Sequence, residues 1–176
     1  TLIVQASVMS IDPIVSLYVK ELLHDRGHIA LVAGIVAATP GLGNLLSASK
    51  VGHIMDRVGP ERVLAIGLGL ATLLFIPMTL TSSPWWLAFW RFLLGLVNAG
   101  LLPAAQTILT LDVPQEAFGR VFSYNQSFQA AGSVFGALLG SLISGLSSYP
   151  MVFLVTGITL LINLLLVLRF RTRQAA

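Results

Sequence analysis

The sequence contains no cysteine among its 176 residues, which excludes disulfide bonds, thiolate metal sites and cysteine nucleophiles. It is also poor in charge: 10% of its residues are charged, whereas an average soluble domain has about 25%. A soluble protein of this size covers its surface with polar groups, and this chain has too few of them. With 56% hydrophobic residues, the chain is expected in a bilayer, where lipid solvates apolar side chains.

Motifs for catalysis and cofactor binding are missing as well. No G-x-x-x-x-G-K-[ST] run is present, so a P-loop ATPase is excluded, and no serine stands in a nucleophile elbow. The histidines lie in predicted loops without H-E-x-x-H-like spacing, and His24 with His28 is the one alternative for a metal site. The formal charge of +3 is spread over segment ends and forms no patch for nucleic acid. The sequence predicts no enzyme, no cofactor, no metal and no nucleic-acid partner.

Six apolar segments are long enough to cross a membrane, which takes about 20 residues at 1.5 Å each for a hydrocarbon core of about 30 Å. The predicted fold class is all-α: a polytopic membrane protein with one six-helix domain over residues 1–176. Because the loops are short, sequential helices are expected to be neighbours in an up-down bundle. The predicted spans are Leu2–Leu22, Ile29–Ser49, Val63–Thr81, Trp85–Leu109, Val121–Leu146 and Met151–Phe170.

The chain begins at Thr1 and turns apolar at once, without a charged segment or a small-residue cleavage site. We therefore interpret the first segment as a span and not as a signal peptide. A start without methionine predicts more protein upstream.

Lysine and arginine are distributed unevenly between the two sides of this bundle. Because cytoplasmic loops carry an excess of these residues, the basic side is predicted to be cytoplasmic, together with both termini. The other side has only Lys20 and Arg26, whereas the basic side has Lys50, Arg57, Arg62, Arg120, Arg169, Arg171 and Arg173.

The second predicted loop, Gly52–Arg62, has the pattern G-x-x-x-D-R-x-G. Gly52 would let a neighbouring helix approach, and Gly59 would permit a tight turn. Asp56 is suited to capping or pairing with a helix end, and Arg57 favours the cytoplasmic side. An ordinary charged turn is the alternative interpretation.

Asp12 is the carboxylate at mid-depth of a predicted span. It shares one helical stripe with Gln5, Met9 and Ser16. Polar groups in hydrocarbon normally face a cavity or a partner, and Pro13 removes a backbone donor and predicts an irregular turn. Two roles stay open: a group that takes up a proton during transport, or a structural hydrogen bond between helices.

Arg91 lies inside the fourth span, where an arginine costs at least about 2.5–3.5 kcal/mol on insertion scales. It shares a face with Gly95, Asn98 and Leu102 and so begins a partly polar stripe. Snorkelling of Arg91 to the outer interface is the alternative.

Glycines stand four residues apart in the fifth span, at Gly132, Gly136 and Gly140. Small residues at this spacing let two helix backbones pack closely. The same span begins with an unusually polar segment, in which Gln129 is expected to line the mouth of a cavity.

These motifs resemble those of the major facilitator superfamily. Gly52–Arg62 resembles its signature between the second and third helices of each half, although Pro60-Glu61 stands where the family usually has a basic pair. Arg91–Pro103 resembles the R-x-x-x-G element of the fourth helix in drug exporters, and Gly132–Gly140 their glycine-rich fifth helix, with Ala137 in place of the usual proline. On this resemblance the chain is identified as the C-terminal half of a twelve-helix transporter, similar to bacterial multidrug efflux (drug:proton antiporter) members.

The resemblance implies secondary-active efflux of drugs or other small lipophilic molecules across the bacterial inner membrane. The first and fourth helices would line the cavity with Asp12, Arg91, Gln5, Ser16 and Asn98, while Gly52, Asp56, Arg57 and Gly59 would form a conformational gate. The implied partners are a small-molecule substrate, the lipid bilayer, and a missing N-terminal half or a second copy. Proton and sodium coupling both stay open, and a non-transporting helical membrane scaffold is the alternative function.

A contact between Asp12 and Arg91 is also predicted. At 1.5 Å per residue, Asp12 lies about 15 Å and Arg91 about 9 Å inside the outer ends of their helices. Two long side chains can bridge the difference of about 6 Å if the first and fourth helices lie side by side.

Overall fold

The computed structural model describes residues 1–23 and 28–174, except the side chains of Asp112 and of residues 170–174. Within these ranges the regular elements are all helices, and six helical stretches are long and apolar enough to cross a membrane, as the sequence predicts. His24 and Arg26, and the side chains of Arg171 and Arg173, lie outside this description. The elements are α1 Leu2–Met9, η1 Asp12–Ile14, α2 Val15–Leu22, α3 Ile29–Val58, α4 Pro60–Thr79, α5 Pro84–Asp112, η2 Gln115–Ala117, α6 Phe118–Leu146 and α7 Tyr149–Gln174.

The first span is broken in its middle. Helix α1 ends at Met9, one turn of 3-10 helix follows, and α2 begins at Val15. Pro13 has no backbone N–H, so the Met9 carbonyl loses its helical donor, and the Ile14 amide bonds to Ile11 at 3.0 Å. This is the irregular turn predicted from Pro13, and it places Asp12 at the break.

The second predicted loop is mostly helical, contrary to expectation. Helix α3 continues to Val58, Gly59 alone separates it from α4, and α4 begins at Pro60. Charged residues signal the end of the hydrocarbon but do not end a helix, so the membrane boundary lies before the helix boundary. Gly59 ends the helix with φ at 92°, a conformation that favours glycine, and Pro60 suits the first position of the next helix.

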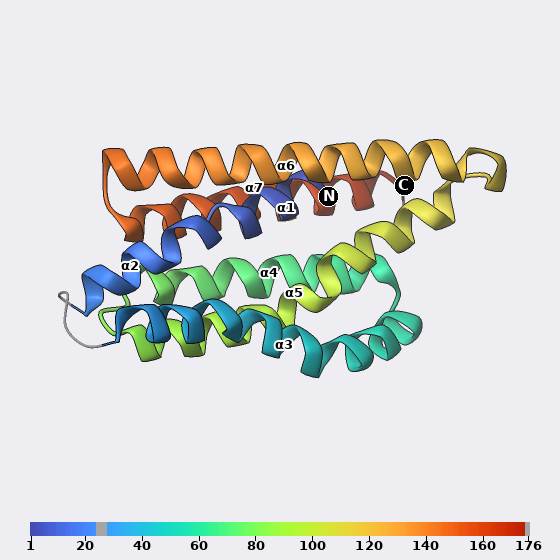
Figure 1. Cartoon of the computed structure of the whole chain (residues 1–176). Coiled ribbons are helices and arrows are strands. Elements are labelled where there is room, and N and C mark those ends of the chain that lie inside the picture. The colour runs from blue at the N-terminus through green and yellow to red at the C-terminus, as the bar shows by residue number, and fades with distance from the viewer. Residues whose placement is uncertain (24–27, 175–176) are drawn as a thin grey trace.

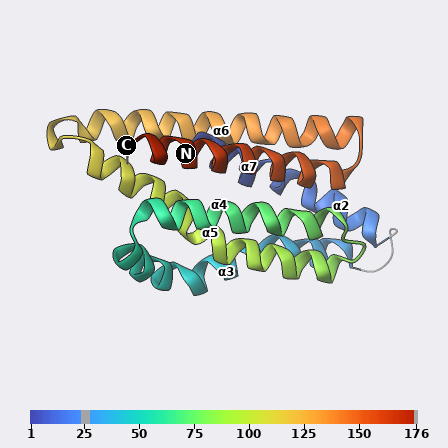
Figure 2. The same ribbon diagram turned by 180° about the vertical axis from the view of Figure 1, so that it is seen from behind.

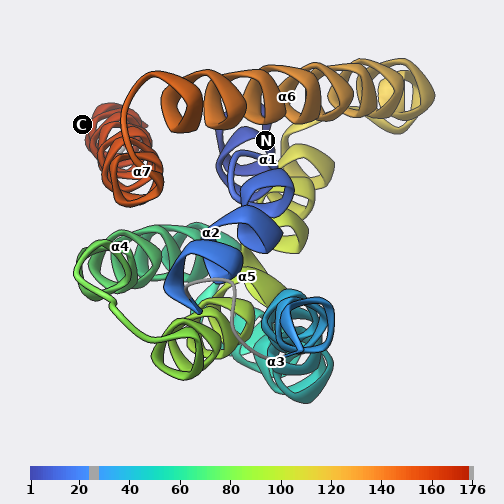
Figure 3. The same cartoon turned by 60° about the vertical axis from the view of Figure 1, so that its left-hand side comes forward.

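Most of the closest helix partners are not sequence neighbours, which corrects the expected packing order in part; the packing of α4 on α5 follows it. Helix α1 packs mainly on α6, α3 on α5, and α4 on both α5 and α7. Figures 1 and 2 show one layer with α1, α6 and α7 and another with α3, α4 and α5, and Figure 3 shows the same helices after a turn of 60°, with α6 crossing the view lengthwise. In order of spans, the pairs are first with fifth, second with fourth, and third with sixth. If the first span is exchanged with the fourth, the second with the fifth and the third with the sixth, the same three pairs result. This is the relation expected between the two halves of an inverted repeat.

Glycines permit the closest helix crossings. A Cβ added at Gly136 would collide with the carbonyl oxygen of Ala6, and one added at Gly95 with that of Pro40. Both obstacles are backbone atoms, so no side-chain rotation relieves the collision. The contact of Gly136 is one of three in register between α6 and the first span: Gly132 with Leu2, Gly136 with Ala6 and Gly140 with Ser10.

The C-terminal end of the first span is held by Tyr18. Its hydroxyl donates to the Thr81 carbonyl at 2.7 Å, and its ring lies 5.6 Å from the rings of both Tyr149 and Phe153, centroid to centroid. Tyr18 therefore joins α2 to the end of α4 and the start of α7. With the glycine contacts of α1, this attachment determines the height of Asp12 in the bundle.

Candidate functional site

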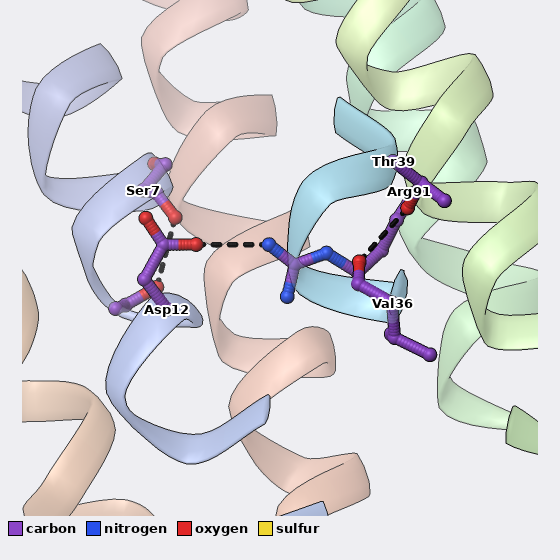
Figure 4. Close-up of polar contacts among 6 residues, drawn as sticks. Ser7, Asp12, Val36, Thr39 and Arg91 are labelled. Carbon is purple, nitrogen blue, oxygen red and sulfur yellow. Dashed lines mark hydrogen bonds and ion pairs between the residues drawn. The ribbon is translucent and has the colours of Figure 1, made fainter. Parts of the chain in front are cut away.

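Arg91 and Asp12 form an ion pair inside the bundle, as predicted from their heights (Figure 4). The Arg91 Nη2 atom lies 2.8 Å from the Asp12 Oδ1 atom, and it donates a hydrogen bond to it. The Arg91 side chain is 5% exposed and that of Asp12 is 48% exposed. The snorkelling alternative is therefore wrong for Arg91, because its guanidinium points to the first span and not to the outer interface.

The two members of this pair are in different surroundings. Arg91 is buried, and its Nη1 atom has no hydrogen-bond partner among the described residues. Asp12 is exposed, although its Oδ1 atom accepts the bond from Arg91. Removing one member of a buried charge pair leaves the other uncompensated, at a cost of about 3–5 kcal/mol. A molecule that binds to Asp12 in place of Arg91 therefore leaves a buried cation on another span without its counter-charge.

Prolines interrupt the helical hydrogen bonds of the first span, which carries Asp12, and of α3, which α5 crosses at Gly95. In the first span, Ser10 donates through its hydroxyl to Ser7 at 2.9 Å and shares a 2.9 Å hydrogen bond with the Thr156 hydroxyl of α7. In α3, Pro40 leaves the Val36 carbonyl without a helical donor, and the Thr39 hydroxyl donates to it at 2.8 Å. Figure 4 shows this hydrogen bond between Thr39 and Val36. Helix α3 thus stays continuous where Gly95 of α5 crosses it.

The hydrogen bonds of the ion pair include none of the other residues predicted for the pathway. Gln5 donates to the Ser133 hydroxyl of α6 at 3.1 Å and so joins two helices. Ser16 is exposed. Asn98 lines a cavity of about 10 Å³ with Ser7 and apolar side chains. Gln129 is half-buried, and its Nε2 atom has no partner in the described part of the chain.

Sequence reasoning missed three hydroxyl residues that hold these helices together. Ser10 and Thr156 join the first span to α7, and Ser133 accepts the bond from Gln5. One signal was available for Ser133, because it lies one helical turn after Gln129 on the same face. No local signal marks the pairing of Ser10 with Thr156, which lie 146 positions apart.

The predicted gate residues lie at the junction of α3 and α4. Gly52, Asp56 and Arg57 belong to the last turns of α3, and Asp56 and Arg57 are exposed. The expected cap is absent, because no side chain caps the N-terminus of α4. Arg57 is in the last turn of α3, where a cation interacts favourably with the helix dipole.

Potential metal ligands do not cluster in the described ranges 1–23 and 28–174. No group of three or more histidine or carboxylate side chains there is arranged to hold a metal ion. His53 lies on α3, and its Nδ1 atom is 2.9 Å from the Ser49 carbonyl oxygen.

Comparison with known proteins decides the family. The profile of the Major Facilitator Superfamily matches residues 1–176, the whole chain. This chain belongs to the major facilitator superfamily. Membership confirms the resemblance seen in the motifs and indicates a multi-pass membrane protein of a transporter family rather than a catalytic one.

Similar curated proteins are multidrug resistance proteins. The chain is 46% identical over 163 residues to multidrug resistance protein MdtG of Salmonella typhimurium and 47% identical over 163 residues to that of Dickeya zeae. In both comparisons the match includes 93% of this chain and 40% of the relative. The chain thus spans about two fifths of the length of these relatives.

Proposed function

We propose that this chain is the C-terminal six-helix domain of a secondary-active transporter that exports drugs or other small lipophilic molecules in exchange for protons. The ion pair between Asp12 and Arg91 carries the proposal. It joins the first span to the fourth in mid-membrane, with the acid accessible and the arginine buried. A helical scaffold gains nothing from a half-exposed carboxylate at this depth, where charge is costly. The names of the relatives support a drug as the transported molecule.

The pair provides a physical basis for exchange. A proton that binds Asp12 removes the negative charge opposite Arg91, and the buried guanidinium then loses its ionic partner. A cationic drug competes for the same carboxylate, because both ligands need its negative charge. Proton and drug therefore exclude each other at Asp12. The cost of an unpaired Arg91 favours a rearrangement of the first and fourth spans, which couples binding to movement.

Alternating access also needs a second bundle against which this domain rocks. Relatives more than twice as long as this chain have enough residues for one. We assign that role to an N-terminal half, with a second copy of this chain as the other option. The junction formed by Gly52, Asp56, Arg57 and Gly59 would act as the gate, since Gly59 is the break between α3 and α4.

The decisive test of the function is transport by the full-length protein. In proteoliposomes with an imposed proton gradient, a lipophilic cationic dye should move against its concentration gradient, in the direction opposite to proton flow. An ionophore that collapses the proton gradient should stop this movement. Correctly inserted protein that moves none of a panel of cationic, neutral and anionic lipophilic dyes would contradict the proposal and leave the scaffold function.

We assign this chain to the inner membrane of a bacterium, with both ends of the domain and the α3–α4 and α5–α6 junctions in the cytoplasm. Single cysteines at exposed positions test this orientation in a full-length protein whose other cysteines are replaced. Ser82→Cys should react with an impermeant thiol reagent added outside cells, and Glu116→Cys should react only after permeabilisation. The reverse labelling pattern would show that the domain is inserted in the opposite orientation.

A further inference from the structure

Helix α3 is longer than the membrane requires. Its 30 residues extend over about 45 Å at 1.5 Å per residue, and hydrocarbon accounts for about 30 Å of that length. About ten residues at its C-terminal end therefore lie at the level of the lipid headgroups. In Figure 1 this end of α3 is at the edge of the bundle, next to the start of α4.

These last turns present three basic side chains on one exposed face. Lys50, His53 and Arg57 recur at helical spacing, while Met55 on the opposite face is buried. Together with Ser49 and Ile54 they line a shallow cavity of about 330 Å³. Neither Lys50 nor Arg57 makes an ion pair within the described residues.

The same face continues as an apolar surface toward the hydrocarbon. Leu42 and Leu46 are 54% and 63% exposed, and with the basic residues they form a single stripe along the helix. Positions 42, 46, 50, 53 and 57 follow the spacing of three or four residues that keeps side chains on one side of a helix. The stripe thus has an apolar part in the membrane and a cationic part at its surface.

We propose that this stripe, Leu42, Leu46, Lys50, His53 and Arg57, binds one anionic phospholipid. The lipid phosphate lies between Lys50 and Arg57 beside the His53 ring, and an acyl chain follows Leu46 and Leu42. Free phosphate would use only the cationic part of the stripe. A zwitterionic lipid would place its own positive group next to Lys50 and Arg57, which repel it.

Asp56 is the adjacent acid on α3. It lowers the net positive charge of this part of the helix but does not cancel it. The inference depends on the proposed orientation, because anionic lipids are abundant in the cytoplasmic leaflet.

Native mass spectrometry of the full-length protein tests this site. The protein is titrated with phosphatidylglycerol and, separately, with phosphatidylethanolamine. We expect one phosphatidylglycerol to be retained with preference, and the double variant Lys50→Gln/Arg57→Gln to bind it about tenfold more weakly. The matched control is Arg62→Gln/Arg120→Gln, which removes the same charge from the same predicted side but outside the stripe. A melting temperature for each protein shows that the variants fold.

Three outcomes would overturn the proposal. Equal weakening in both double variants would mean a general effect of charge, and unchanged binding in Lys50→Gln/Arg57→Gln would mean that another part of the protein covers the stripe. Displacement of the lipid by millimolar inorganic phosphate would indicate a plain anion site. None of these results depends on transport. A protein that fails to retain the lipid leaves the proposed function untouched, and a protein that transports nothing can still retain the lipid.

Discussion

An Asp12→Asn variant of the full-length transporter should release no protons when drug is added, and it should bind a cationic drug more weakly than the wild type does. Asparagine has nearly the shape of aspartate and can still accept a hydrogen bond from Arg91, so the substitution removes the charge of Asp12 and leaves its size unchanged. It carries no charge and exchanges no proton. The measurement is the pH change of a weakly buffered solution of purified protein on drug addition, with drug binding followed in parallel by fluorescence.

The matched control is Glu116→Gln, which neutralises an exposed acid of η2 outside the predicted spans. Its proton release should equal that of the wild type. If Asp12→Asn instead releases as many protons as the wild type, Asp12 has a structural role, and the coupling carboxylate lies in a part of the protein beyond this chain.

Gly136→Leu should prevent stable folding of the domain. A Cβ at Gly136 collides with the Ala6 backbone, so α6 and the first span would have to separate along the whole line of glycine contacts. Overpacking usually costs 1–3 kcal/mol, and we expect about 3 kcal/mol or more here because a backbone cannot rotate away. The melting temperature of the full-length protein in detergent and its yield in the membrane should both fall.

Gly145→Leu is the control for this effect in the same helix. A Cβ added at Gly145 meets no atom within 4 Å, so the melting temperature should stay near that of the wild type. Equal losses in both variants would show that leucine is harmful anywhere in α6 and would remove the special role of the α1–α6 crossing. Unchanged stability of Gly136→Leu would mean that the two helices lie farther apart than described.

The pairing of Asp12 with Arg91 was accessible from sequence for a simple reason. Depth in a membrane follows from counting residues at 1.5 Å each, and charges in hydrocarbon seek a partner. Gln5, Asn98 and Gln129 are different. They are neutral and can be satisfied by any nearby hydroxyl or carbonyl, so their positions in the spans did not predict which contacts they make. The structure places Gln5 on Ser133, outside the hydrogen bonds of the ion pair.

The sequence by itself determined the membrane class, the six spans, the family and the mid-membrane charges, because hydrophobic length and motif spacing are local properties of the chain. Only the tertiary structure decided which spans pack together, and it showed that α3 continues as one helix through most of the predicted loop to Val58. Every span is apolar on most faces, and lipid solvates such faces as well as another helix does. Helix pairing therefore depends on small residues and hydroxyls far apart in sequence, such as Gly136 against Ala6 and Ser10 against Thr156.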